Sequence, residues 1–112
     1  MREISRMTTV VYALVALKPG VDRGEYERYE REVDYVVASK LKSIVSYRTH
    51  RITEMPAISG GPWDYVEQIE ITNRADYEHD LEVGGKALID ELFEKYLDRS
   101  RTYLLWSERI DP

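Results

Sequence analysis

YRTHR (residues 47–51) and WDYVEQIEI (residues 63–71) are the two segments that decide the fold of this chain. Both are rich in aromatic and β-branched residues, and the loop between them holds two prolines and two glycines, so we predict a pair of antiparallel β-strands. Both strands also carry charged residues among the apolar ones. Because a buried polar side chain has to be hydrogen-bonded or used, this strand pair is where we expect the chemistry.

Two further strands are predicted at the ends of the chain. Residues 8–18 are apolar on both faces, which is typical of a central strand covered on both sides. Residues 102–110, with Tyr103, Leu105 and Trp106, form the last strand. With the middle pair extended to residues 43–53 and 63–72, the chain contains four strands.

Two helices separate these strands. Asp22, with Glu25 three residues later, predicts a capped helix that runs to about Lys40. Helical spacing predicts a buried stripe of Tyr26, Tyr29, Val33, Val36 and Val37, and a solvated face of Glu25, Glu27, Arg28, Glu30, Arg31 and Glu32. Asn73 caps a second helix, which Gly84-Gly85 are expected to break or kink. The order β-α-β-β-α-β predicts an α+β, ferredoxin-like fold, in which two helices cover one face of a four-stranded antiparallel sheet.

Length and composition narrow the classes of protein. The 112 residues predict a single domain over residues 8–112, after a flexible extension at residues 1–7. A net charge of −5 with no basic cluster argues against a nucleic-acid partner. The absence of cysteine excludes disulfides, thiolate metal sites and cysteine nucleophiles. Neither a signal peptide nor a membrane-spanning run is recognisable, so we expect a cytoplasmic protein with no membrane partner.

The first strand predicts a homodimer. Two helices cover only one face of the sheet, yet this strand is apolar on both faces, so the open face needs a cover. The open face of a second copy supplies one. The alternative is a monomer with a partly exposed sheet. The two faces of this strand carry Val11, Ala13, Val15 and Leu17 on one side and Val10, Tyr12, Leu14 and Ala16 on the other.

The sequence also resembles a known family, the small REDY-like (HapK-type) proteins of the dimeric α+β barrel superfamily. The resemblance covers residues 14–105, and one departure is Val36, where the family pattern leads us to expect proline. Four blocks in this order carry it: LKPGV (residues 17–21), REVDY (31–35), SYRTHR (46–51) and WDYVEQIEI (63–71).

The resemblance implies a role in pigment or alkaloid metabolism of the prodigiosin or bisindole type. It suggests lyase, dehydratase or cyclase chemistry on an aromatic heterocyclic intermediate, such as a carbinolamine or an imine, without a cofactor. The superfamily also includes cofactor-free oxygenases of phenolic substrates, so a monooxygenase is an alternative. A further alternative is a protein that binds and shields a reactive intermediate without catalysis.

His50 is the predicted catalytic acid/base residue, because a histidine beside a carboxylate can transfer protons near neutral pH. Asp34 and Glu70 are the predicted partners, Asp34 reaching the site from the first helix. We expect this site in a cleft between the sheet and the helices. The alternative is a structural histidine at the sheet surface or the dimer seam.

The pairing of the two middle strands decides which carboxylate lies beside His50. If Thr53 stands opposite Trp63, Tyr47 faces Ile69, Thr49 faces Glu67 and Val45 faces Ile71, and His50 lies on the other face with Arg48 and Glu70. A slip of one residue moves His50 beside Tyr65 and Glu67. Sequence alone leaves both registers open.

Several aromatic and polar residues are expected to line the substrate site. A tyrosine at its wall can hold a substrate oxygen or stack on an aromatic ring. Arg48 is also a candidate, although its charge can equally be paired with Glu70 or with an acid of a partner chain. The predicted substrate-binding residues are Tyr12, Tyr26, Tyr47, Tyr65, Glu67, Arg48 and Trp106.

No metal or cofactor is expected. Only two histidines are present, His50 and His79, and neither has a metal-ligand spacing to a second ligand. His79 lies among acidic residues and is interpreted as a solvated helix residue. No glycine-rich phosphate loop follows a strand, because Gly60-Gly61 lie between two strands of a pair.

Overall fold

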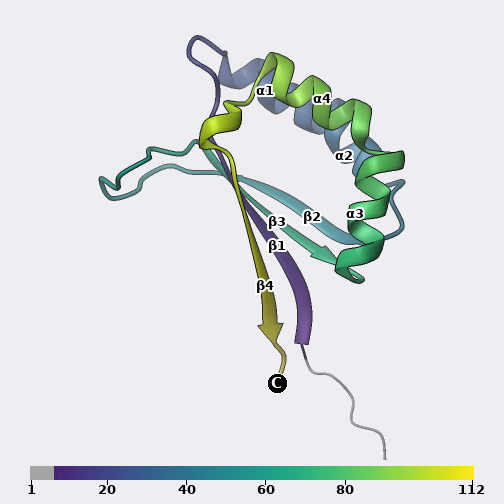
Figure 1. The fold of residues 1–112 in the computed structure, drawn as a ribbon. Helices are drawn as coiled ribbons and strands as arrows, with labels where there is room; N and C mark the ends of the chain where they lie inside the picture. Colours follow the sequence, from purple (N-terminus) through teal and green to yellow (C-terminus); the bar gives the residue numbers. More distant parts are fainter. Residues whose placement is uncertain (1–6) are drawn as a thin grey trace, which may run out of the picture.

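Four antiparallel strands form one sheet in the order β2-β3-β1-β4, in a computed structural model that describes residues 7–112 (Figure 1). The central position of β1 and β3 agrees with their burial. Every second side chain of β3 is buried, and β1 buries the consecutive Val10 and Val11 as well as Ala13 and Val15. The strands are β1 (Met7–Val15), β2 (Ile44–Arg51), β3 (Tyr65–Ile71) and β4 (Tyr103–Ile110).

Two helical arms cover one face of this sheet (Figure 1). The predicted ferredoxin-like α+β fold is therefore confirmed. The first arm consists of α1 (Arg23–Tyr29), the π-helical turn η1 (Glu30–Asp34) and α2 (Tyr35–Ala38). The second consists of α3 (Arg74–Val83) and α4 (Lys86–Lys95), and the short 3-10 helix η2 (Arg99–Arg101) leads into β4.

The predicted helix boundaries follow from local hydrogen bonds. The side chain of Asp22 accepts from the backbone N–H of Glu25, and Asn73 caps α3 in the same way. The break at Gly84-Gly85 is present between α3 and α4. A Cβ atom on Gly84 would lie 2.8 Å from Cδ2 of Leu41, so glycine lets the end of α3 approach the loop that follows α2.

The register of β2 and β3 settles which side chains share a face. Tyr47 pairs with Ile69 and Thr49 with Glu67, as the first of the two predicted registers has it. Towards the start of β2 the prediction is wrong, because Ile44, not Val45, pairs with Ile71. An irregularity between Ile44 and Ser46 inserts one extra residue, as a β-bulge does.

The core lies between the helical arms and the face of the sheet that carries Val11, Ala13 and Val15 of β1. Tyr26 of α1 is fully buried and packs against Tyr65 of β3, with ring centroids 4.9 Å apart. Burying an aromatic side chain of this size stabilises the fold by about 1.5–3 kcal/mol, so this contact anchors α1 to the sheet.

The opposite face of the sheet carries no helix. On β4 it presents Tyr103 and Leu105, which are 48% and 51% exposed. Figure 1 shows the far ends of β1 and β4 running beyond the helical layer. No helix of the described part is long and apolar enough to cross a membrane.

Two expectations at the ends of elements need correction. Met7 belongs to β1 and not to a flexible extension; the rest of the predicted extension, residues 1–6, lies outside the described residues. Val36 is 45% exposed although the apolar periodicity placed it in the buried stripe of the first helix. The π-helical turn just before it changes the angular spacing of the residues that follow, which accounts for the difference.

Candidate functional site

Three carboxyl groups surround the hydroxyl of Tyr47 beneath the first helical arm. The Tyr47 hydroxyl oxygen lies 2.9 Å from Oδ2 of Asp34, 2.9 Å from Oε2 of Glu67 and 3.4 Å from Oε1 of Glu30. All three acids are buried, with exposures of 3%, 9% and 3% for Asp34, Glu67 and Glu30. We call Glu30, Asp34, Glu67 and Tyr47 the carboxyl cluster.

Two pairs of elements bring the carboxyl cluster together. Glu30 and Asp34 are the first and last residues of the π-helical turn, so both point from the same stretch of helix toward the sheet. Tyr47 and Glu67 lie on adjacent strands, one pair apart on the same face, because Tyr47 is opposite Ile69 and Thr49 is opposite Glu67. π-Helical turns occur often at functional sites.

The hydrogen-bond count requires a proton on at least one of these acids. A phenol has one proton to donate, yet the Tyr47 oxygen is in hydrogen-bond contact with both Asp34 and Glu67. One of these contacts must therefore be donated by a protonated carboxyl group, directly or through a shared proton. The carboxyl cluster therefore holds a proton that is shielded from water.

Burial and mutual repulsion identify where that proton resides. Burial, followed by the contact with Asp34 and its charge, raises the pKa of Glu30 far above its usual range. Burial and the charge of Asp34 also raise the pKa of Glu67. Glu30 therefore keeps its proton near neutral pH, whereas Glu67, with its pKa raised to about 7, can both hold and lose a proton there.

Nothing in the described structure neutralises these acids with a positive charge. Within residues 7–112, no basic side chain forms an ion pair with Glu30, Asp34 or Glu67. Burial and the nearby carboxylates raise the pKa of Tyr47 as well, so its hydroxyl keeps its proton. Any negative charge on Glu30, Asp34 or Glu67 is therefore balanced only by a bound proton.

The carboxyl cluster forms part of the wall of an apolar cavity between the sheet and the helices. The cavity has a volume of about 340 Å³, and Asp34, Tyr47 and Glu67 line it. Most of the remaining wall consists of leucine, isoleucine, valine, alanine and aromatic side chains from both arms and the sheet. An apolar chamber with a few convergent polar groups is the usual form of a small-molecule site.

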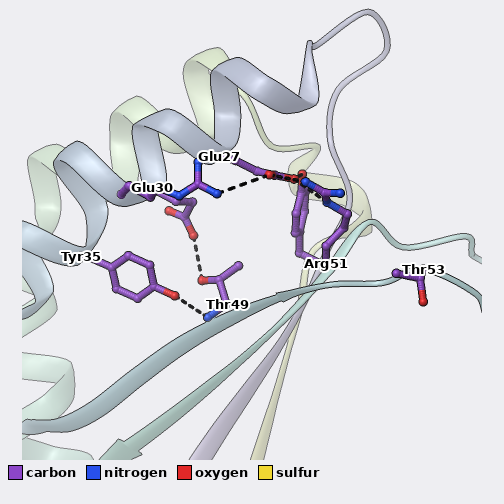
Figure 2. Close-up of a pocket in the computed structure, with 8 residues that line it drawn as sticks. Glu27, Glu30, Tyr35, Thr49, Arg51 and Thr53 are labelled. Atoms are coloured by element: carbon purple, nitrogen blue, oxygen red, sulfur yellow. Dashed lines mark hydrogen bonds and ion pairs between the residues drawn. The ribbon is translucent and has the colours of Figure 1, made fainter.

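A second, polar cavity lies on the other side of Glu30, between α1 and β2 (Figure 2). Figure 2 shows Glu30 accepting a hydrogen bond from Oγ1 of Thr49, 2.9 Å away, next to Tyr35, whose hydroxyl accepts from the backbone N–H of Thr49 at 2.7 Å. Arg51 binds Glu27 at the rim and lowers the pKa of that acid to about 2. Glu30 therefore separates a polar cavity from the apolar one.

His50 does not lie in the cleft where it was expected. It pairs with Val66, and side chains alternate along a strand, so His50 points to the helix-free face while Thr49 points to the helices. His50 and Arg48 are exposed there. Glu70 lies on this same face and pairs with Arg109 at 3.0 Å, not with Arg48. The expected meeting of His50, Glu70 and Asp34 is therefore wrong.

The predicted lining residues divide between several places. Tyr47 and Glu67 line the apolar cavity, and Tyr65 lines the polar one, where its hydroxyl donates to Glu27 at 2.7 Å. Tyr26 is a core residue and Tyr12 lies on the helix-free face. Trp106 packs between Tyr77 and Arg74 on the helix side of the sheet.

Sequence reasoning missed Glu30, which it assigned to the solvent-facing side of the helix. A signal was available, because Glu30 is four residues from both the buried Tyr26 and Asp34. The carboxyl cluster also bears on the prediction that no metal is bound. One oxygen from each of Glu30, Asp34 and Glu67 lies within 4.8 Å of the others, a spacing that can hold a cation, so that prediction stays a prediction.

Comparison with known proteins agrees with the fold. The family model of REDY-like protein HapK matches residues 9–110. The crystal structure of HapK from Hahella chejuensis is similar over 93% of this chain and 94% of that chain, with a TM-score of 0.75 and 25% identity. No curated protein gives a significant match.

More distant structures share the fold alone. An ethyl tert-butyl ether d (ethd) family protein from Bacillus halodurans has a TM-score of 0.69 at 12% identity, over 92% of this chain and 99% of that chain. A dimeric ferredoxin-like protein of unknown function from Thermobifida fusca has a TM-score of 0.69 at 11% identity, over 96% and 95%. The architecture is therefore shared well beyond one family.

Proposed function

The chain belongs to the REDY-like HapK family, and on this premise we propose that it is a small enzyme of secondary metabolism that performs acid/base chemistry without a cofactor. Its substrate is an aromatic heterocyclic intermediate of the prodigiosin or bisindole type, bound in the apolar cavity. The reaction is of the lyase, dehydratase or cyclase kind, with a carbinolamine or imine as the reacting group.

The observation that carries this proposal is the position of the carboxyl cluster in the wall of the apolar cavity. A ligand in the cavity would meet Asp34, Tyr47 and Glu67, with a protonated Glu30 behind them. An acid that holds its proton next to an acid that can lose it forms a general acid/base pair, which contributes about 10²–10⁴-fold to a proton-transfer step.

Dehydration of a carbinolamine illustrates the chemistry. The nitrogen lone pair forms the C=N bond while the C–O bond breaks, and the leaving hydroxyl takes a proton from Tyr47, which recovers one from the acids beside it. The N–H proton of the resulting iminium then passes to Glu67. One proton leaves the carboxyl cluster and one returns, so the enzyme ends in its starting state and water is the only by-product.

We assign the proton transfer to the carboxyl cluster rather than to His50. The imidazole lies on the far side of the sheet from both cavities, so it is out of reach of a ligand in either one. A structural role for His50 at a dimer seam is the better proposal.

We also propose that the chain forms a homodimer through the helix-free face. Tyr103 and Leu105 present a half-exposed apolar strip there, and Tyr12 and Leu14 lie beside them on β1. Solved relatives from Bacteroides fragilis and Thermobifida fusca are described as dimeric. Packing two such faces together would remove the strip from water.

A binding protein without catalysis is the second candidate, because most of the cavity wall is apolar and needs no chemistry. The test is the rate of imine formation from pyrrole-2-carboxaldehyde and methylamine, followed by absorbance, with wild type, Glu67→Gln and Glu78→Gln. Glu78 is exposed and pairs with Arg74, so its variant is the matched control. Catalysis predicts acceleration by wild type and Glu78→Gln that falls about 100-fold in Glu67→Gln. Binding of the aldehyde without acceleration would support the second candidate instead.

A further inference from the structure

We infer that the apolar cavity selects an organic cation, with a protonated nitrogen against Asp34, Tyr47 and Glu67 and an apolar body along the rest of the chamber. This inference rests on the proposed function, since it concerns the same cavity, and it specifies the class of ligand. It follows from the charge balance of the site, from its unpartnered polar atoms and from the character of its walls.

The buried acids of the carboxyl cluster have no basic partner in the described part of the chain. Three acids are buried together, and none is paired with a basic side chain of the described residues. One proton is enough to satisfy the contacts of Tyr47 with Asp34 and Glu67. Any further charge on these acids lacks a counter-ion, and burial of an unpaired charge is costly. A cationic ligand would supply the missing partner.

Unpartnered polar atoms also lie behind this part of the wall, next to Tyr47 but outside the lining of the apolar cavity. Oε2 of Glu30 and the hydroxyl of Tyr26 are buried and make no hydrogen bond among residues 7–112. Burial and then the charges of Glu67, Glu30 and Asp34 raise the pKa of Tyr26, so its hydroxyl lies close to these acids. Buried polar groups are normally satisfied, so the carboxyl cluster has more acceptor oxygens than donors, and a cationic nitrogen in the cavity would add donors at Asp34 and Glu67.

The walls favour an organic cation over a metal ion. The Tyr47 hydroxyl stands 2.9 Å from both Asp34 and Glu67, so it occupies the space between these acids that an ion would need. A divalent ion also keeps oxygen ligands or water around it, whereas this chamber is mostly apolar. A nitrogen cation needs charge-assisted hydrogen bonds at one end only, and the aromatic walls suit its body.

Among the described residues, the wall of the apolar cavity also contains one basic side chain, that of Arg99. Arg99 lines the cavity, and its guanidinium stacks over the ring of Phe93 at 4.0 Å from the centroid. It makes no ion pair with the carboxyl cluster in the described structure. Arg99 therefore leaves the acids available to a cationic ligand.

The test uses two indoles that differ in one group. Tryptamine carries an ammonium at neutral pH, and tryptophol carries a neutral hydroxyl on the same two-carbon chain. Calorimetric titration of the full chain at pH 7.5 is expected to show tryptamine binding about tenfold more tightly or better, because hydrogen bonds to a charged group are stronger than neutral ones. Glu67→Gln and Asp34→Asn should each remove most of this preference, and Glu78→Gln should keep it.

The outcomes separate this inference from the proposed function. If both indoles bind equally and Leu88→Trp, which fills the cavity, abolishes both, the cavity binds heterocycles but the preference for a cation is overturned. If neither indole binds, the inference fails, while the aldehyde assay still decides the proposed function. If Mn²⁺ binds the wild type, displaces tryptamine and loses its affinity in Glu67→Gln, the acids are a metal site and the inference is also overturned.

Discussion

The hydroxyl of Tyr47 and the carboxyl group of Glu67 are 2.9 Å apart on adjacent strands, and the same hydroxyl is 2.9 Å from Asp34. The single phenolic proton can be donated to only one of these two carboxyl groups, so the other contact has to be donated by a protonated acid. The carboxyl cluster therefore holds a buried proton at the wall of the apolar cavity.

Removing the Tyr47 hydroxyl should destabilise the protein and abolish activity. Tyr47→Phe leaves buried carboxyl oxygens without a donor, which costs about 1–3 kcal/mol of the free energy of unfolding. Urea denaturation measures this loss. Tyr12→Phe is the control, because Tyr12 lies on the helix-free face. Equal free energies of unfolding for the two variants would show that the Tyr47 hydroxyl does not stabilise the fold.

Stability should fall as the pH rises through neutrality. The pKa of Glu30 is raised in the folded state, so its contribution is complete below the unfolded value of about 4.3 and is lost as the pH rises toward the folded value. The free energy of unfolding should therefore decrease between pH 5 and pH 8, by up to about 1.4 kcal/mol per pH unit for each proton involved.

Glu30→Gln isolates this effect, because glutamine resembles the protonated acid at every pH. Urea denaturation at pH 5 and pH 8 should show a smaller decrease for Glu30→Gln than for wild type. Glu32→Gln, two residues further along the helix on its exposed side, should behave as wild type. The same decrease in all three proteins would place the titrating group elsewhere.

The first part of this arrangement was accessible from sequence. Alternation along β2 and β3 gives two sets of side chains, and the pairing of Tyr47 with Ile69 and of Thr49 with Glu67 was one of the two predicted registers. Alternation does not say which set faces the helices, because each set mixes polar and apolar residues. We predicted the acid/base chemistry on the set that contains His50, but the helices cover the set that contains Tyr47 and Thr49.

The rest depends on irregularities that have no plain sequence signal. The π-helical turn from Glu30 to Asp34 points both acids toward the sheet, whereas ideal helical spacing predicted Glu30 on the solvated face. The extra residue between Ile44 and Ser46 shifts the start of β2. The break at Gly84-Gly85 was predictable, because paired glycines weaken any helix.

The exposed strip on β4 predicts the oligomeric state. Sedimentation of the wild type should give twice the chain mass of 13.2 kDa, and Leu105→Asp should give the monomer, because a charge would be buried in the proposed interface. Val83→Asp is the control, since Val83 is 71% exposed on the helical layer. A monomeric wild type, or a dimer that survives Leu105→Asp, would exclude this face as the interface.

The infrared spectrum at pH 7 tests the central claim most directly, because the C=O stretch of a protonated carboxyl group is separate from that of a carboxylate. Wild-type protein should show this band in the folded state at neutral pH, and Glu30→Gln should lose the larger part of it, leaving only the contribution of Glu67. Absence of the band from the wild type would mean that the acids around Tyr47 hold no proton, and the proposed acid/base role of the carboxyl cluster would then be untenable.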